Sequence, residues 1–209
     1  MNDFIAVLSK RLADNLPGNK AHEPLRAVPT GKVIPKFEHV SPPRAGSVLI
    51  LLYEQEGEHY FPLIKRTDYK GLHSGQISLP GGKKEKGETE EQTALRETFE
   101  EIGVDPLAVK IIGQLSNFFV IPSNFMVTPF VASIDYKPAF IPDPREVDKI
   151  IQANLHNLID DDAITTAEIL AAGQFKLNAP HFKVEDEIVW GATAMMLNEL
   201  RMVVREILK

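Results

Sequence analysis

One helical segment is the most tightly specified feature of this sequence. Thr89 and Gln92 have the spacing of a capping box, in which each side chain bonds the other residue's backbone N–H group. The helical pattern then continues to Ile102, where Gly103 and Pro106 supply a C-terminal stop. The sequence therefore predicts a helix from residue 89 to residue 102, and the rest of the fold must be arranged around it.

Strand patterns lie on both sides of this helix. Apolar runs at 47–53 and 60–66, joined by a polar turn, indicate an antiparallel hairpin, and further runs follow at 109–115 and 126–134. A last amphipathic helix begins near Gly191. Strands before and after a central helix predict a mixed α/β fold with a partly antiparallel sheet.

The first 43 residues differ from the remainder of the chain. Apolar residues recur at helical spacing between Phe4 and Leu12, and Pro17 ends that pattern. The proline content then rises from residue 19 onward, which is typical of an irregular segment. We therefore expect an N-terminal helix and irregular arm over residues 1–43 and one domain over residues 44–209.

The composition excludes several classes of function. The chain has no cysteine, so it can form neither disulfides nor thiolate zinc sites. A formal net charge of -6 argues against a broad basic surface for nucleic acid. No stretch approaches the roughly 20 apolar residues of a membrane span, and the N-terminus lacks the pattern of a secretory signal. We therefore expect a cytoplasmic protein that binds neither membranes nor nucleic acids.

Three glutamates share one face of the predicted helix. Glu97, Glu100 and Glu101 are related by i+3 and i+4 spacing, which places them within an arc of about 100 degrees. Mg²⁺ takes oxygen ligands, so such a cluster can hold a divalent ion that activates water and neutralises charge on a phosphate. A glutamate-rich helix is often merely soluble, and that is the better interpretation of Glu90 and Glu91.

The residues before the helix complete a family pattern. Gly81-Gly82 permits close backbone approach to an ion or phosphate, and residues 82–104 resemble the Nudix signature across its full span. Thr98 departs from it, because the family usually has a large aliphatic residue there. The resemblance implies an α/β/α Nudix sandwich with a mixed sheet, Mg²⁺ or Mn²⁺ as cofactor, orientation of the loop and helix by Arg96 and Glu88, and metal ligands from Glu97, Glu100, Glu101 and the Gly81 carbonyl.

The segment before the signature is more specific. Residues 63–82, LIKRTDYKGLHSGQISLPGG, resemble the extra motif of the coenzyme A diphosphatase branch, although Gly71 stands where that branch usually has arginine. Residues 123–131, 142–147 and 188–194 also resemble this branch. The resemblance implies hydrolysis of coenzyme A to 3',5'-adenosine bisphosphate (3',5'-ADP) and 4'-phosphopantetheine.

Several residues are candidates for contact with such a substrate. Arg66 lies at the mouth of the Gly81-Gly82 turn, where its guanidinium can bind phosphate. Lys83 begins a lysine-containing loop that can meet an anion. Phe125 is as consistent with adenine stacking as with the core.

A general base must come from outside the helix, because all three of its clustered carboxylates are assigned to metal. Glu146 is the candidate, since it lies in the proline-containing loop Pro142–Val147, and Asp143 is the reserve. A solvated loop acid beside Arg145 is an equally good interpretation of Glu146.

Two other interpretations of the chain stay open. A Nudix hydrolase of ADP-ribose, NADH or a nucleoside triphosphate would carry the same catalytic helix. A non-catalytic Nudix domain that binds a nucleotide belongs to a different class, and the complete set of glutamates disfavours it. The sequence also leaves a homodimer open.

Overall fold

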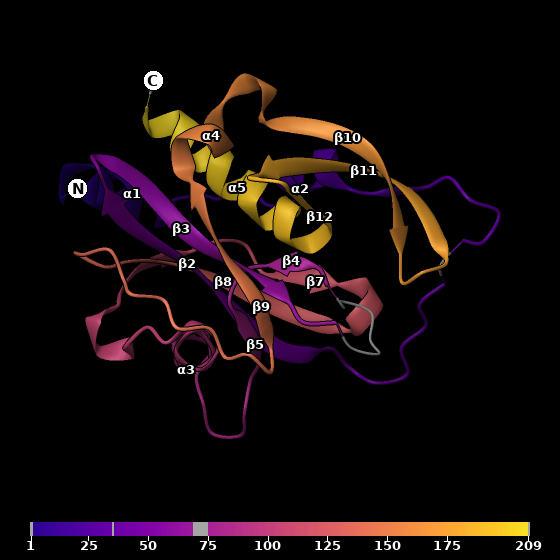
Figure 1. The fold of residues 1–209 in the computed structure, drawn as a ribbon, viewed down its shortest axis with the longest axis horizontal. Coiled ribbons are helices and arrows are strands. Elements are labelled where there is room, and N and C mark those ends of the chain that lie inside the picture. The colour runs from indigo at the N-terminus through magenta and orange to yellow at the C-terminus, as the bar shows by residue number, and fades with distance from the viewer. Residues whose placement is uncertain (1, 35, 69–74, 209) are drawn as a thin grey trace.

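The main body of the molecule is a mixed β-sheet with helices on both faces (Figure 1). The computed structural model describes residues 2–34, 36–68 and 75–208 of the 209-residue chain. Helix α3 (Glu90–Ile102) packs on one face of this sheet, and α1 (Asn2–Leu12) and α5 (Gly191–Ile207) pack on the other. The predicted α/β/α arrangement is confirmed.

Eight strands of the described residues make up the main sheet: β2 (Arg44–Gln55), β3 (Glu58–Arg66), β4 (Ile77–Ser78), β5 (Gly81–Lys83), β6 (Lys110–Gln114), β7 (Phe118–Val120), β8 (Phe125–Ser133) and β9 (Val147–Asn154). Strands β2 and β8 run parallel, whereas the other neighbours run antiparallel, so the sheet is mixed as predicted. A second sheet beside α5 joins β1 (Val28–Pro29), β10 (Ile164–Ala171), β11 (Phe175–Val184) and β12 (Glu187–Trp190).

Strand β2 is buried on both faces. Leu49 and Leu51 belong to the apolar cluster under α3, and Ile50 and Leu52 belong to the cluster under α5. Successive side chains of a strand point to opposite faces, so a continuous apolar run is what a two-sided layer requires. The described residues also form short connecting helices: α2 (Asn19–His22), η1 (Glu23–Leu25), η2 (Pro106–Ala108), η3 (Ile121–Ser123), α4 (Leu155–Ile159) and η4 (Asp161–Ala163).

The β2–β3 hairpin is confirmed, but its turn is shorter than predicted. Strand β2 continues to Gln55 and β3 starts at Glu58, so only Glu56 and Gly57 form the turn. Both have positive φ, at 55° and 83°. Two consecutive positive φ angles are the feature of the tight turn that matches the twist of paired strands.

Helix α3 has both ends that the sequence predicts. The Thr89 hydroxyl accepts a hydrogen bond from the Gln92 N–H group, and the Gln92 side chain accepts one from the Thr89 N–H group. Gly103 follows with φ 73°, the left-handed conformation that ends many helices. The helical spacing of Ala94, Leu95, Thr98, Phe99 and Ile102 predicts an arc that faces the core, but Phe99 departs from it and is 52% exposed.

The N-terminal segment packs on the α5 side of the sheet. The predicted first helix is confirmed as α1, with Leu8 and Leu12 buried in the larger core cluster. The expected irregular arm contains α2 and η1, and Leu25 belongs to the same cluster. The domain division at residue 44 stays a prediction. Within the described part of the chain, no helix has the length and apolarity needed to span a membrane.

Candidate active site

A cavity of about 780 Å³ lies at the end of the main sheet where β5 meets α3. Its lining contains all the residues that the sequence nominates for catalysis, metal binding or substrate contact except Asp143, the reserve general base: Arg66, Gly81, Gly82, Lys83, Arg96, Glu97, Glu100, Glu101, Phe125 and Glu146. The fold therefore gathers side chains that are separated by up to 80 residues in the sequence around one space.

Glycines allow strand β5 to pass very close to its neighbours. Gly81 has φ 147°, and a Cβ atom there would lie 2.2 Å from the Ser47 carbonyl oxygen. A Cβ atom at Gly82 would lie 2.5 Å from the Glu97 carboxylate. Gly81 excludes a side chain, because the backbone of Ser47 and Val48 blocks the space and φ is positive, whereas a side chain at Gly82 would displace the Glu97 carboxylate. The sequence predicts a turn at Gly81-Gly82, but these residues begin strand β5, whose backbone lies directly against the carboxylates of α3.

Glu101 is the most deeply placed carboxylate of the cavity, at 1% exposure. It accepts a hydrogen bond of 2.8 Å from the Gly81 N–H group, and the Arg66 guanidinium lies 3.6 Å from its other oxygen. Burial raises the pKa of Glu101 to about 7; Arg66 and Gly81 oppose this rise, and the charges of Glu97 and Glu146 add to it. The chain thus provides little compensation for this negative charge.

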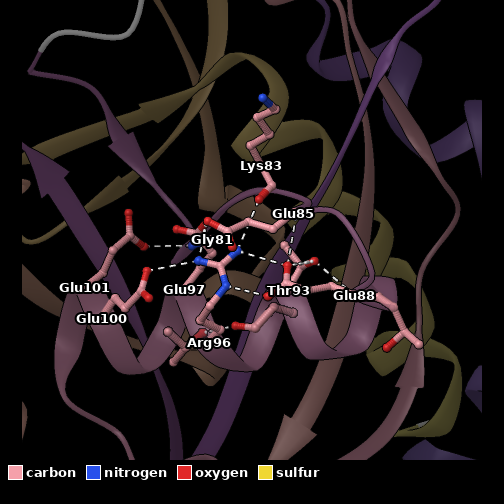
Figure 2. Close-up of polar contacts among 12 residues, drawn as sticks. Gly81, Lys83, Glu85, Glu88, Thr93, Arg96, Glu97, Glu100 and Glu101 are labelled. Atoms are coloured by element: carbon pink, nitrogen blue, oxygen red, sulfur yellow. Dashed lines mark hydrogen bonds and ion pairs between the residues drawn. The ribbon is translucent and has the colours of Figure 1, made fainter.

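Arg96 links the glutamates of the helix to the loop before it (Figure 2). Its Nη1 donates to Glu97 and to Glu100, at 3.0 Å each, and its Nε donates to Glu88 at 2.6 Å. Nη2 donates to Glu88 and to the Lys83 carbonyl. Arg96 and Glu88 therefore join loop and helix in the way that the resemblance implies.

Glu97 and Glu88 differ in how their charges are held. Burial raises the pKa of Glu97, although the contact with Arg96 opposes the rise. The hydrogen bond from Arg96 lowers the pKa of Glu88 to about 2, with help from the Glu85 N–H group and the Thr93 hydroxyl. Glu88 is thus a structural anion whose charge is stabilised by its partners, whereas the charge of Glu97 at the cavity is only partly stabilised by Arg96.

The donor set of the cavity fits a hard divalent cation. Glu97, Glu100 and Glu101 offer carboxylate oxygens, which Mg²⁺ and Mn²⁺ prefer. The hydrogen bonds from Gly81 and Arg96 each occupy only one of the two oxygens of a carboxylate. Among the described residues, no three acidic or histidine side chains already converge as a finished metal site. Arg96 now bonds both Glu97 and Glu100, so these side chains must turn before they can share an ion. The Gly81 carbonyl accepts a hydrogen bond from Arg66 at 3.3 Å and has a second lone pair available.

The substrate candidates have unequal surroundings. Lys83 is exposed, and its side chain extends away from α3 in Figure 2. Arg66 lies between Gly81 and Glu101. It is therefore held at the side of the cavity formed by Gly81 and the α3 glutamates, which we call the catalytic edge. The ring of Phe125 faces the Arg44 guanidinium at 4.2 Å from its centroid, so one face of the ring is already covered. Residues 69–74 of the predicted motif, including Gly71, lie outside the described residues.

The loop that carries Glu146 is fixed to the end of α3. The Asp143 N–H group donates to the Glu101 carbonyl at 3.0 Å, and the Thr67 N–H group donates to the Glu146 carbonyl at 3.0 Å. Glu146 is exposed toward the cavity and close enough to raise the pKa of both Glu97 and Glu101. Asp143, the reserve candidate, bonds Arg145, which lowers its pKa to about 2. Glu146 is therefore the better placed of the two.

Sequence patterns did not identify the opposite wall of the cavity. This wall includes Arg26 of the N-terminal segment, Phe118 of β7, Trp190 at the end of β12, and Met195 and Met196 near the start of α5. The position of Trp190 directly before the last helix predicts a core anchor, but its side chain is only half-buried and lines the cavity. An apolar stripe on a helix predicts burial without specifying whether protein or ligand covers it.

Comparisons with known proteins agree with this geometry. A family model described as the NUDIX domain matches residues 43–185. Nudix hydrolase 3 of Caenorhabditis elegans is 33% identical over 170 residues, which covers 74% of this chain and 71% of the relative. Nudix hydrolase 15, mitochondrial, of Arabidopsis thaliana is 33% identical over 162 residues, covering 74% of this chain and 56% of the relative.

A more distant relative and a solved structure complete the comparison. The peroxisomal coenzyme A diphosphatase NUDT7 of Mus musculus is 28% identical over 140 residues, covering 66% of this chain and 58% of the relative. The solved MutT protein of Methanosarcina mazei Go1 has a TM-score of 0.53 at 21% identity, covering 82% of this chain and all of that one, so it shares the fold. The glutamate-lined cavity, the family model and the 33% identical relatives together show that the chain belongs to the Nudix hydrolase family, whose members generally use divalent metal ions.

Proposed function

We propose that this Nudix hydrolase cleaves the diphosphate of coenzyme A, giving 3',5'-ADP and 4'-phosphopantetheine, with Mg²⁺ or Mn²⁺ as its cofactor. The observation that carries the proposal is the cavity. Its glutamates and Arg66 lie beside Gly81 and Gly82 of β5, and the space of about 780 Å³ continues past them to Trp190 and Met196. Cavities that enclose cofactor-sized molecules span about 300 to 1,000 Å³, so both a diphosphate and the group attached to it can be accommodated.

The sequence supports coenzyme A over other diphosphates. Residues 63–82 resemble the extra motif of coenzyme A diphosphatases, and Arg66 of that motif lies at the catalytic edge. The murine relative is itself named a coenzyme A diphosphatase. The cavity also contains many apolar residues beyond the carboxylates, which suits the uncharged pantetheine arm.

The residues of the cavity suggest a division of roles. An ion held by Glu97, Glu100 and Glu101 would neutralise charge on the diphosphate and make water a better nucleophile. Arg66 uses one of its five N–H donors on Gly81 and can bind phosphate oxygen with others. Arg96 joins α3 to the loop before it through Glu88 and the Lys83 carbonyl, and Glu146 accepts a proton from the attacking water.

The alternatives differ in what occupies the far part of the cavity. ADP-ribose and NADH contain the same diphosphate between two ribose rings, so the catalytic edge alone does not separate them from coenzyme A. A non-catalytic nucleotide-binding role would leave the buried carboxylates without a chemical task.

A substrate panel tests the proposal. We would incubate the purified protein with Mg²⁺ or Mn²⁺ and with coenzyme A, ADP-ribose, NADH or a dinucleoside polyphosphate, and separate the products by chromatography. The expected result is the highest kcat/KM for coenzyme A, with the two named products in equal amounts. A clear preference for ADP-ribose would contradict the proposed substrate, and hydrolysis of no member of the panel would contradict the proposed activity.

A further inference from the structure

Three segments that are distant in the sequence build the wall of the cavity opposite α3. They are the N-terminal segment 17–26, which contributes Arg26, the start of β7, which contributes Phe118, and the first turns of α5, which contribute Met195 and Met196. Figure 1 shows α2 of the first segment beside α5. The shape of this wall therefore depends on what holds the three segments together.

Glu199 lies where the three segments meet, and it is completely buried. Its Oε1 accepts hydrogen bonds from the Gly18 N–H group at 2.8 Å and from the Ser116 hydroxyl at 2.6 Å. Its Oε2 accepts one from the Ser116 N–H group at 3.1 Å, and the His22 Nε2 lies 3.1 Å from the same oxygen. One carboxylate of α5 thus binds both of the other segments.

The contacts around Glu199 lead directly to the cavity. The His22 ring meets the Phe118 ring edge to face, with 5.0 Å between their centroids. Ser116 precedes Phe118 by two residues. Met195 and Met196 lie one helical turn before Glu199 on α5, and the neighbouring Asn198 amide donates to the Ala21 carbonyl at 2.7 Å. A change at Glu199 would therefore move residues that line the cavity.

The site requires a carboxylate and not merely a side chain of this size. Gly18 and Ser116 direct three N–H and O–H donors toward it, and an ionised carboxylate only accepts. A glutamine of the same shape would turn an NH₂ group toward some of these donors, and a buried donor without a partner is costly.

We propose that Glu199 is a positioning residue for the substrate: it holds the N-terminal segment and β7 against α5 so that they form a fixed wall of the substrate cavity. The proposal rests on the proposed function to the extent that the cavity is the substrate site. Glu199 itself lines no part of the cavity and touches no reacting atom, so its effect should be on substrate binding and not on the chemical step.

The test compares two charge-removing variants of the same helix. Glu199→Gln removes the buried anion, whereas Glu206→Gln removes an anion that pairs with Arg11 of α1 at 2.7 Å and lies outside the cavity lining. With the best substrate of the panel, Glu199→Gln should raise KM on the order of tenfold and change kcat by less than about threefold. Glu206→Gln should leave both constants at the wild-type value.

The outcomes separate this proposal from the proposed function. Wild-type KM in Glu199→Gln, or a lower kcat at unchanged KM, would overturn the positioning role, because the second pattern reports only a smaller folded fraction. A wild-type protein that is inactive on the whole panel would refute the function instead. If circular dichroism shows that Glu199→Gln is unfolded, Ser116→Ala decides the matter, because it deletes one hydroxyl donor and retains the other three partners. It should raise KM by about threefold, and an unchanged KM would overturn the proposal.

Discussion

Two buried glutamates lie on opposite sides of the main sheet, Glu101 on α3 and Glu199 on α5. They are 1% and 0% exposed, yet their partners differ. Glu199 is surrounded by four donor groups from Gly18, His22 and Ser116. Glu101 has one backbone donor, from Gly81, and a guanidinium at 3.6 Å. Hydrogen bonds therefore offset the cost of burying the Glu199 carboxylate, whereas few contacts offset the cost of burying Glu101.

The pKa values of the two carboxyls move in opposite directions. Burial raises the pKa of Glu199, but the hydrogen bonds from His22, Ser116 and Gly18 outweigh it and bring the pKa below its ordinary value. Burial raises the pKa of Glu101 to about 7, and its few partners do not reverse the rise. A buried charge without compensation is costly, and such groups concentrate at functional sites. The charge of Glu199 is therefore stabilised by groups of the chain itself, whereas the charge of Glu101 fits a partner from outside the chain.

The largest expected difference between Glu101 and Glu199 is the effect of their substitution on kcat. Glu101→Gln and Glu97→Gln should each lower kcat by about a thousandfold or more, because they remove charge from proposed metal ligands without removing volume. Glu199→Gln should keep kcat within about threefold, and Glu91→Gln, on the exposed side of the same helix α3, is the matched control. Initial rates at saturating substrate and Mg²⁺ measure this, and wild-type turnover in Glu101→Gln would remove the basis of the comparison.

Stability without metal should change in the opposite sense in the two variants. In chelator at pH 8, Glu199→Gln should lower the free energy of unfolding by about 3 kcal/mol, because it breaks a buried network of charged hydrogen bonds. Glu101→Gln should raise it by about 1 to 3 kcal/mol, because an uncompensated buried charge is lost. Urea denaturation measures both values. A loss of stability of equal size in both variants would show that Glu101 is as well satisfied as Glu199.

The pH dependence of stability sharpens the same contrast. The pKa of Glu101 is higher in the folded state than its ordinary value of 4.5, so its contribution is fully present below pH 4.5 and is lost as the pH rises through about 7. The pKa of Glu199 is lowered, so its contribution is present above pH 4.5 and is lost as the pH falls through the folded-state pKa. In chelator, the wild-type protein should therefore lose stability between pH 5 and pH 8.

Each variant should remove one limb of that profile. Glu101→Gln should abolish most of the loss between pH 5 and pH 8, and Glu199→Gln should reduce the loss on the acid side. Urea midpoints across the pH range provide the measurement. A wild-type profile in Glu101→Gln would mean that another group carries the alkaline limb.

A smaller effect is expected at Glu146, which is exposed and shares the cavity with Glu101. Glu146→Gln should lower kcat about tenfold, leave KM near wild type and flatten the acid limb of the pH–rate profile, because it removes the proposed general base. Asp143→Asn is the control, since Asp143 bonds Arg145 of the same loop. Wild-type kcat with an unaltered profile would return the role to the carboxylates of α3.

The contrast between these residues also shows what sequence alone can predict. Helix α3, its capping box and the Glu97, Glu100 and Glu101 face depend on contacts within a few residues, so local spacing was enough. The Glu199 cluster joins Gly18 to a residue 181 positions later, and no local pattern marks that pairing. Glu199 lies on a different face of α5 from the apolar stripe of Ala194, Leu197 and Val204, so the amphipathic pattern of this helix gives no sign of its role.

The formation of the second sheet and the exposure of Phe99 also depend on tertiary contacts, which local sequence patterns do not reveal. Strand β10 alternates only partly between exposed and half-buried residues, and β11 contains Pro180, which is unusual within strands, so neither has a strong strand pattern. Phe99 has the spacing of a core residue but lies on the open side of α3. Thr98, the departure from the family signature, can be buried in place of an aliphatic residue because its hydroxyl donates a hydrogen bond to the Ala94 carbonyl at 2.7 Å.

The most direct measurement is the thermal stability of the wild-type protein, Glu101→Gln and Glu199→Gln, each with chelator and with a saturating concentration of Mg²⁺ or Mn²⁺. A cation that binds only the folded state stabilises it by about 2.7 kcal/mol at a hundred times its Kd. The wild-type protein and Glu199→Gln should therefore show a clear rise in Tm with metal, and Glu101→Gln should show little or none. An equal rise in all three proteins would contradict the account, because the cation would then bind without the carboxylate that the fold leaves uncompensated.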